Sequence, residues 1–314
     1  MLDIQKQKVF ITDVTGRDGF QMEKDWIPTE QKIAIINGII RTGVKRVELT
    51  SFVSPKAVPQ LKDAKEVVGG IEKGDTQIAV LVPNKKGAEM AVETEIDEIN
   101  AVISVSETHN KKNVRKTLDQ SIQEISSINR IAKEHGKKLN VGLATTFGCP
   151  FEGLYPVQKV EELIRRLTEL EINSFALSDT TGMANPQQVF YFVEYLKSAF
   201  PEETFSLHLH NTRGMGLSNM LAGVQAGIEA FDAALGGIGG CPFAPGATGN
   251  VCLEDSVHMF EQMGIITGID LELLIGEAKN LESVLGYTLP GQVMKSGQST
   301  KTYQARKESV SKCH

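Results

Sequence analysis

The stretch Thr204-Phe-Ser-Leu-His-Leu-His-Asn-Thr-Arg-Gly214 carries the pattern from which the fold can be predicted. It reads as a short β-strand between an acidic, proline-containing turn and a glycine. Side chains two residues apart on a strand point the same way, so His208 and His210 project together from its carboxyl end. Two imidazoles in this arrangement make half of a metal site, although polar residues also occur at strand ends for other reasons. The remaining ligands must come from elsewhere in the chain.

Seven further stretches share a mostly apolar, β-branched character without strict alternation, which is typical of strands buried on both faces. The eight predicted strands cover residues 9–14, 46–52, 77–82, 101–106, 140–146, 174–178, 205–210 and 230–235. Amphipathic helical patterns follow most of them, and we expect Thr29 to cap the first, which Gly43 ends. The other predicted helices cover residues 114–133, 157–170, 187–200, 217–227 and 253–263.

The spacing of the strands predicts the topology. Strand starts recur about every 20 to 40 residues, the size of one βα unit. Eight such units within residues 1–266 predict an α/β protein with a single (β/α)8 TIM barrel. A doubly wound open sheet is the alternative, but no GxGxxG follows the first strand. We expect residues 267–314 to form a short C-terminal helical extension, with a helix over 271–285, and a polar tail packed on the barrel.

Composition narrows the classes of function. The chain has 314 residues, of which 41% are hydrophobic and 23% charged, as in ordinary globular proteins. A net charge of −6 without a long basic run argues against nucleic acid as a partner. No apolar run approaches the ~18 residues that cross a bilayer, and the start lacks the apolar core of a signal peptide. The four cysteines are widely spaced, which favours a reduced, cytoplasmic protein over a disulfide scaffold.

Polar, ionisable and glycine residues collect where the predicted strands end. This is the end of a TIM barrel at which active sites are built. The segments concerned are 15–21, 51–56, 83–84, 106–113, 145–150, 178–182, 208–210 and 236–250.

Barrel closure makes the eighth strand a neighbour of the first. The histidine pair on the seventh strand can then converge with Asp18 and Asn250 near the barrel mouth. Two imidazoles, a carboxylate and an amide oxygen, with waters in the remaining positions, suit octahedral Mg²⁺ or Mn²⁺ better than tetrahedral structural Zn²⁺.

With these motifs in place, the chain resembles the 3-hydroxy-3-methylglutaryl-CoA lyase family of the DRE-TIM metallolyase superfamily, from about residue 9 to about residue 290. The motifs are RDGFQ (17–21), SFVSPK (51–56), SETHNKKN (106–113), FGCPFEG (147–153), SDTTG (178–182), HLHN (208–211) and GGIGGCPFAPGATGN (236–250). The last is the most specific, because this loop separates the lyases from their Claisen-condensing relatives. The R-D-G and H-x-H elements are shared across the superfamily.

The resemblance implies a retro-Claisen cleavage that yields acetyl-CoA and acetoacetate. An acyl-CoA would chelate a divalent cation through its C3 hydroxyl and a carboxylate oxygen. A base removes the hydroxyl proton, the C2–C3 bond breaks, and the enolate of acetyl-CoA is protonated. The family also implies a role in leucine degradation and a homodimer.

The resemblance further implies roles for individual residues. Asp18, His208, His210 and Asn250 would hold the metal, and Asp18 and His208 would also serve in catalysis. Arg17 would stabilise the enolate oxygen. Cys241, on a loop able to close over the site, would act as the acid, and Glu48 would orient Arg17 or a proton-transfer group. Supporting or substrate-binding residues are Gln21, Asp179, Glu254, Ser51, Lys111 and Lys112.

Plainer interpretations exist for several of these side chains. Arg17 and Asp18 could form a surface ion pair, and Cys241 could be a small hydrophobe in a tight loop. Glu254 could simply favour a helix N-terminus, while Lys111 and Lys112 could belong to a solvated helix start. The pattern at Cys149 and Cys252 favours packing.

Departures from the family pattern leave the acyl group open. Residues 14–21 read VTGRDGFQ where the family has VGPRDGLQ, and Ala57 stands where an aromatic residue is usual. HLHN replaces HxHD, and SDTTG replaces GDTIG. Since no predicted metal ligand is lost, these changes bear on the identity of the substrate more than on the type of reaction. Citramalyl-CoA or another 3-hydroxy-3-alkyl acyl-CoA is therefore an alternative substrate.

Two other functions compete with a lyase. A Claisen-condensing synthase is disfavoured by the glycine-cysteine loop and by the short tail. A catalytically silent barrel that binds acyl-CoA or a protein partner would be expected to lose Arg17, Asp18 or Cys241, and all three are present.

Overall fold

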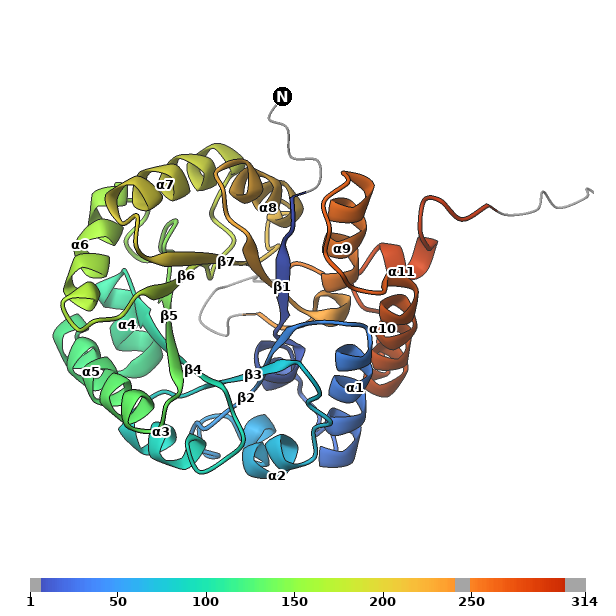
Figure 1. The fold of residues 1–314 in the computed structure, drawn as a ribbon, viewed down its shortest axis with the longest axis horizontal. Helices are drawn as coiled ribbons and strands as arrows, with labels where there is room; N and C mark the ends of the chain where they lie inside the picture. The colour runs from blue at the N-terminus through green and yellow to red at the C-terminus, as the bar shows by residue number, and fades with distance from the viewer. Residues whose placement is uncertain (1–6, 241–248, 303–314) are drawn as a thin grey trace, which may run out of the picture.

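The predicted barrel is confirmed. The computed structural model describes residues 7–240 and 249–302, and in it eight parallel strands close in chain order, with β8 pairing with β1 (Figure 1). The strands are β1 (Phe10–Asp13), β2 (Arg46–Ser51), β3 (Gln77–Leu81), β4 (Glu98–Ser104), β5 (Lys138–Ala144), β6 (Ser174–Asp179), β7 (Thr204–Leu209) and β8 (Ala230–Ala233).

Helices surround the strands as an outer ring (Figure 1). They are α1 (Thr29–Arg41), α2 (Ala64–Gly69), α3 (Lys85–Ala91), α4 (Glu107–Val114), α5 (Leu118–Glu134), α6 (Val157–Thr168), α7 (Pro186–Ala199), α8 (Gly216–Gln225), α9 (Leu253–Gln262), α10 (Leu271–Leu285) and α11 (Val293–Ser296). Short helical turns add η1 (Thr15–Gly19), η2 (Phe20–Met22), η3 (Pro59–Leu61) and η4 (Leu235–Gly237). The helix α10 packs against α1 and α9, on the side of the barrel where the chain closes (Figure 1).

Two predictions about the helices are wrong. The single helix expected over residues 114–133 is two helices, α4 and α5, because Arg115 adopts a left-handed conformation with φ of 58°. The new start is fixed by a capping box, in which the Thr117 hydroxyl accepts from the Gln120 backbone and the Gln120 side chain accepts from Thr117. Thr29 makes no cap; its hydroxyl instead donates to Oδ2 of Asp63 at 2.8 Å. No helix was predicted from the sequence at the positions of the short helices α2 and α3.

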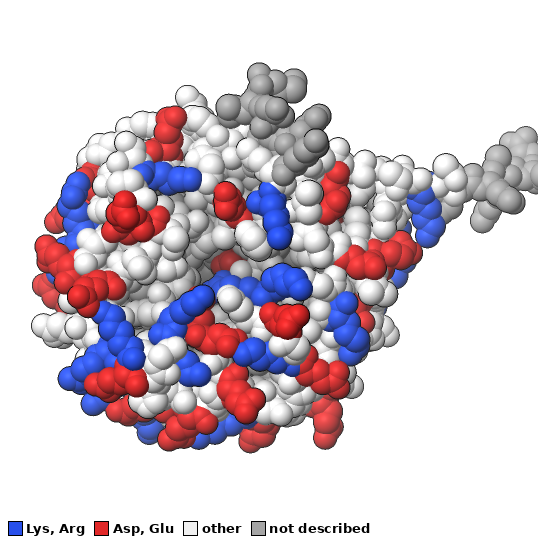
Figure 2. Space-filling view, viewed as in Figure 1, with Lys and Arg blue, Asp and Glu red and all other residues white. Residues whose placement is uncertain are grey.

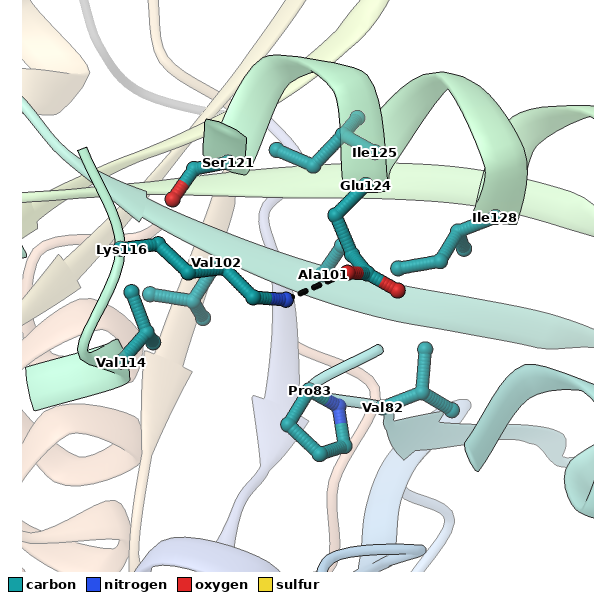
Figure 3. A pocket seen from close by; sticks show the side chains of 10 residues that line it. All are labelled: Val82, Pro83, Ala101, Val102, Val114, Lys116, Ser121, Glu124, Ile125 and Ile128. Carbon is teal, nitrogen blue, oxygen red and sulfur yellow. Dashed lines mark hydrogen bonds and ion pairs between the residues drawn. The ribbon is translucent and has the colours of Figure 1, made fainter. Parts of the chain in front are cut away.

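The packing of α5 onto the barrel leaves little empty space. Ile125 and Ile128 point from α5 toward β4, and the ion pair between Lys116 Nζ and Glu124 Oε2, at 2.5 Å, lies beside them (Figure 3). The cavity between these side chains holds about 10 Å³, room for about one water. It is therefore a packing gap and not a ligand site.

The barrel interior is polar where TIM barrels usually carry branched apolar layers. The side chain of Arg46, on β2, contacts Glu98 and Asn100 of β4, and lies near Asp232 of β8. Neither β4 nor β8 neighbours β2 in the sheet, so these contacts cross the inside of the barrel.

The surface gives two further observations. On the face drawn in Figure 2, acidic and basic side chains are interspersed, and its described residues form no extended basic patch. Within residues 7–240 and 249–302, no helix combines the length and the apolar character needed to cross a bilayer.

Candidate metal centre

The structure brings the histidine pair, Asp18 and Asn250 together at the carboxyl ends of the strands. His208 lies in β7 and His210 directly follows it, while Asp18 belongs to η1, the turn that leaves β1. An isolated antiparallel bridge pairs His210 with Asn250. All four residues are buried, with exposed fractions of 8% or less.

The ligand atoms converge. Nε2 of His208 lies 3.1 Å from Nε2 of His210, which is 3.5 Å from Oδ2 of Asp18. Candidate ligand atoms of these three residues all lie within 4.8 Å of one another. Asn250 Nδ2 donates to Asp18 Oδ2 at 2.8 Å and to the Ile238 carbonyl at 3.0 Å.

This donor set fits a divalent cation. The Oδ1 atom of Asn250 is buried without a hydrogen-bond partner among the described residues. Leaving a buried acceptor unpaired is costly, and a cation beside it would remove that cost. A carboxylate, an amide oxygen and two imidazoles are a ligand set compatible with Mg²⁺ or Mn²⁺, with water in the open positions.

Charged neighbours hold Asp18 ionised. Burial favours its neutral form, but Arg17 and the two histidines outweigh burial and keep the pKa of Asp18 well below its usual range. Nη1 of Arg17 donates to Oδ1 of Asp18, and Gln21 Nε2 donates to the same oxygen at 2.7 Å.

Arg17 is itself fixed on a second side. Its Nε donates to Oε2 of Glu48, in β2, at 2.5 Å. Burial opposes the charge of Arg17, yet Asp18 and Glu48 raise its pKa above the ordinary value. Oε1 of Glu48 accepts from Nδ2 of Asn100 at 2.7 Å, so the carboxylate is held at both oxygens. The arginine is therefore a permanent, oriented positive charge beside the metal centre.

Asp232 is a site residue that the sequence analysis missed. It faces His208 in the register of β7 and β8, and its Oδ2 lies 3.1 Å from His208 Nδ1. Burial lowers the pKa of His208, but the hydrogen bond and the charge of Asp232 outweigh it and raise the pKa. A carboxylate behind a histidine ligand fixes the tautomer that offers Nε2 to a metal. The available signal was that Asp232 is the one carboxylate in the strand predicted at 230–235.

Two glycines mark the base of the glycine-cysteine loop. A Cβ on Gly239, whose φ is 108°, would lie 2.5 Å from Asn250 Nδ2. A Cβ on Gly249 would lie 1.9 Å from the carbonyl oxygen of Gly237. Both ends of the loop are therefore at the metal centre. Cys241 itself lies outside the described residues.

Glu254 does not join the metal centre. It lies in the first turn of α9, fully buried, and its Oε2 accepts from the backbone of Gly236 at 3.0 Å. Its side chain groups with those of Cys252 and Asp255. Burial raises the pKa of Glu254 to about 7. Its contact therefore supports the turn that leads into the loop.

Asp179 and Ser51 lie at strand ends but make local contacts. The Asp179 carboxylate accepts from the backbones of Met183 and Ala184, at 2.8 and 3.0 Å, and burial raises its pKa. It closes the turn after β6. The Ser51 hydroxyl, at the end of β2, is buried without a hydrogen-bond partner among the described residues.

The two lysines that were candidates for phosphate contacts lie on α4. Lys111 forms an ion pair with Glu107 at 3.0 Å, and Lys112 Nζ sits 3.9 Å from the centre of the Phe151 ring. Both lysines therefore already have interaction partners, Glu107 and Phe151, at this outer helix.

A cavity of about 620 Å³ opens beside the loop base. Its lining includes Gly239 and Gly249 on one side, and Trp26 and Tyr287 on the other. It therefore extends from the base of the loop to the end of α10. This volume lies in the range of small-molecule sites.

Comparison with known proteins gives consistent similarities. The HMGL-like family model matches residues 8–280. The hydroxymethylglutaryl-CoA lyase of Bacillus subtilis is 45% identical over 295 residues, covering 92% of this chain and 98% of that protein. The (R)-citramalyl-CoA lyase of Chloroflexus aurantiacus is 38% identical, covering 93% and 95%. A solved HMG-CoA lyase from Acinetobacter baumannii, in complex with coenzyme A and 3-methylmalate, is 46% identical with a TM-score of 0.91, covering 95% and 98%.

Proposed function

Because the chain belongs to the HMGL-like family, we propose that it is a metal-dependent carbon–carbon lyase that cleaves 3-hydroxy-3-methylglutaryl-CoA to acetyl-CoA and acetoacetate. The observation that carries the proposal is the convergence of Asp18, His208, His210 and Asn250 beside the fixed charge of Arg17. The 45% identity to the Bacillus subtilis lyase, over nearly the whole of both chains, supports the choice of substrate.

The four converging residues, Asp18, His208, His210 and Asn250, would hold Mg²⁺ or Mn²⁺. The ion supplies Lewis acidity toward an oxygen of the substrate. A base takes the C3 hydroxyl proton, C3 becomes the ketone of acetoacetate, and cleavage of the C2–C3 bond leaves negative charge on the thioester oxygen of the acetyl-CoA enolate. Arg17 stabilises that charge, because its guanidinium is already oriented by Glu48 and pays no reorganisation when the charge develops.

Cys241 is the acid that we assign to the enolate carbon. Support comes from the loop base, since Gly239 packs against Asn250 and so starts the loop at the metal centre. The thiol proton goes to C2 of the enolate, which becomes the methyl group of acetyl-CoA. The thiolate regains a proton from solvent or from the hydroxyl group of the next substrate.

The remaining assignments follow from the family and the cavity. The cavity between the loop base and Tyr287 is large enough for the acyl and pantetheine parts of an acyl-CoA. Lys111 and Lys112 are candidates for the CoA phosphates, in exchange for their present partners. We also infer a cytoplasmic homodimer that acts in leucine degradation.

A second substrate is favoured by specific observations. The citramalyl-CoA lyase shares 38% identity over 93% of this chain, and residues around the motifs, such as Ala57, depart from the usual lyase pattern. Citramalyl-CoA cleavage would leave pyruvate in place of acetoacetate, by the same bond rearrangement.

One assay tests both substrates. Purified protein with Mn²⁺ is given either acyl-CoA, and acetyl-CoA and the keto acid are both measured. We expect acetoacetate from 3-hydroxy-3-methylglutaryl-CoA, loss of activity with a chelator, and recovery with Mn²⁺. Faster release of pyruvate from citramalyl-CoA would reassign the substrate. Absence of acetyl-CoA from both would refute the lyase.

A further inference from the structure

Arg46 lies at the opposite end of the barrel from the metal centre. It is the first residue of β2, and a cavity of about 450 Å³ opens beside it. That cavity is lined by the first residues of other strands, including Gln77, Ser174 and Thr204. The Arg46 side chain points into the barrel, where it meets groups from three strands.

One arm of contacts leads from Arg46 to a predicted metal ligand. Its Nη1 donates to the Thr12 hydroxyl at 2.9 Å and lies 3.9 Å from Oδ1 of Asp232. That oxygen has no hydrogen-bond partner among the described residues, so Arg46 is its electrostatic partner. The other oxygen of Asp232 faces Nδ1 of His208.

A second arm leads to the charge beside the metal centre. Nη2 of Arg46 donates to Oδ1 of Asn100 at 3.1 Å. The same oxygen also accepts from Nδ2 of Asn140, at 3.3 Å. Together these two donors set the orientation of the amide, so that Nδ2 is turned to Glu48, which in turn holds Arg17. The two arms meet again where Arg17 contacts Asp18, and so form a closed circuit of polar contacts.

We propose that Arg46 is a positioning residue for the metal centre, which orients Asp232 behind His208 and Asn100 behind Glu48 from the far end of the barrel. The inference rests on the metal site of the proposed function. A purely structural arginine would affect stability alone. A positioning arginine also affects metal affinity and turnover, because His208 and Arg17 depend on it.

The chain offers a matched control. Glu98 contacts the same guanidinium, with Oε1 2.5 Å from Nη2, but leads to neither the metal ligands nor Arg17. Glu98→Gln therefore disturbs the same buried network without breaking either arm. A loss of stability that Arg46→Gln and Glu98→Gln share can then be distinguished from a loss of metal affinity that only Arg46→Gln shows.

The test measures Mn²⁺ binding to the metal-free protein by electron paramagnetic resonance, together with thermal unfolding, kcat and KM. We expect Arg46→Gln to weaken Mn²⁺ binding about 5- to 10-fold, less than the roughly 10- to 100-fold loss of a group that contacts a metal ligand directly, because Arg46 acts on His208 through Asp232. We also expect it to lower kcat more than it changes KM. Arg46→Lys keeps one charge but cannot serve both arms, and we expect a loss of about threefold. Glu98→Gln should stay within about twofold of the wild type.

A double-variant cycle tests the route through Asp232. Asp232→Asn combined with Arg46→Gln should bind Mn²⁺ no more weakly than Asp232→Asn alone. The inference is overturned if the folded Arg46 variants bind Mn²⁺ like the wild type, if Glu98→Gln loses as much affinity as Arg46→Gln, or if the losses of the double variant multiply. Failure of the wild type itself to bind Mn²⁺ would instead refute the metal site of the proposed function.

Discussion

Asp232 and His208 face each other across neighbouring strands, with Oδ2 of the carboxylate 3.1 Å from Nδ1 of the imidazole. The carboxylate accepts a hydrogen bond from the Nδ1–H group, which leaves the lone pair of Nε2 free on the side of Asp18 and His210. The pair thus turns a histidine at a strand end into a directed metal ligand.

Replacing Asp232 with asparagine tests this tautomer. The asparagine amide can donate to Nδ1, which favours protonation of Nε2 and removes the lone pair offered to a cation. We expect Asp232→Asn to weaken Mn²⁺ binding about 10- to 100-fold, measured by titration of the metal-free protein. Asp97→Asn, which alters a carboxylate paired with Lys73 near the surface, is the control and should bind normally. Unchanged affinity in Asp232→Asn would remove its supporting role.

Arg17→Gln tests charge stabilisation of the enolate. The glutamine keeps a donor near Asp18 but removes the positive charge, so we expect kcat to fall by about 10²- to 10³-fold with a smaller change in KM. Steady-state kinetics with saturating Mn²⁺ provide the measurement. Arg166→Gln, whose ion pair with Asp119 lies on the surface, should retain full activity. Full activity in Arg17→Gln would sink the mechanism.

Cys241→Ala tests the proton donor. We expect a large fall in turnover, of about 10²- to 10⁴-fold, while Mn²⁺ affinity changes little because Cys241 is not among the proposed ligands. Cys149→Ala is the matched control, since Cys149 is buried and its thiol lies 3.0 Å from the Ser106 hydroxyl. Equal turnover in Cys241→Ala and the wild type would leave the loop with a structural role only.

The buried acids predict how stability depends on pH. Burial raises the pKa of Asp13 to about 7 from 3.8 and that of Glu254 to about 7 from 4.5. Between these values the folded protein holds protons that the unfolded chain has lost. The free energy of unfolding therefore falls as pH rises from about 4 to about 7, by up to about 1.4 kcal/mol per pH unit for each group.

Glu254→Gln isolates one of these groups. The glutamine oxygen can still accept from the backbone of Gly236 but cannot ionise. We therefore expect the free energy of unfolding of the variant to fall less steeply as pH rises, so that at about pH 8 the variant is more stable than the wild type. Denaturant unfolding at several pH values provides the measurement. Glu93→Gln, at an exposed ion pair with Lys65, should follow the wild-type curve. A wild type that gains stability with rising pH across this window would contradict the assignment.

The sequence was sufficient to predict the barrel because strand-sized apolar runs recur in it at a regular spacing. Barrel closure also predicted that Asp18 and Asn250 meet the histidine pair, since β8 must return to β1. Both conclusions depend on strand order alone, and not on which way a side chain points inside the barrel.

The inner polar circuit could not be predicted in the same way. Arg46 is the first residue of β2 and Asp232 is an interior residue of β8, and neither position differs in sequence from an ordinary strand with one charged residue. Their roles depend on the register of β1 with β2 and β8, which places Thr12 beside both. The break between α4 and α5 was missed for a different reason, because the sequence does carry a signal for it, the capping box formed by Thr117 and Gln120.

The tight glycines at the loop base set a rule for protein engineers. Gly239 and Gly249 have no room for a side chain against Asn250 and Gly237, whatever residues lie between them. A chimaera that exchanges the intervening segment with that of another acyl-CoA lyase should therefore be joined at these two positions. Grafts cut there would leave the cation-binding framework of the recipient intact.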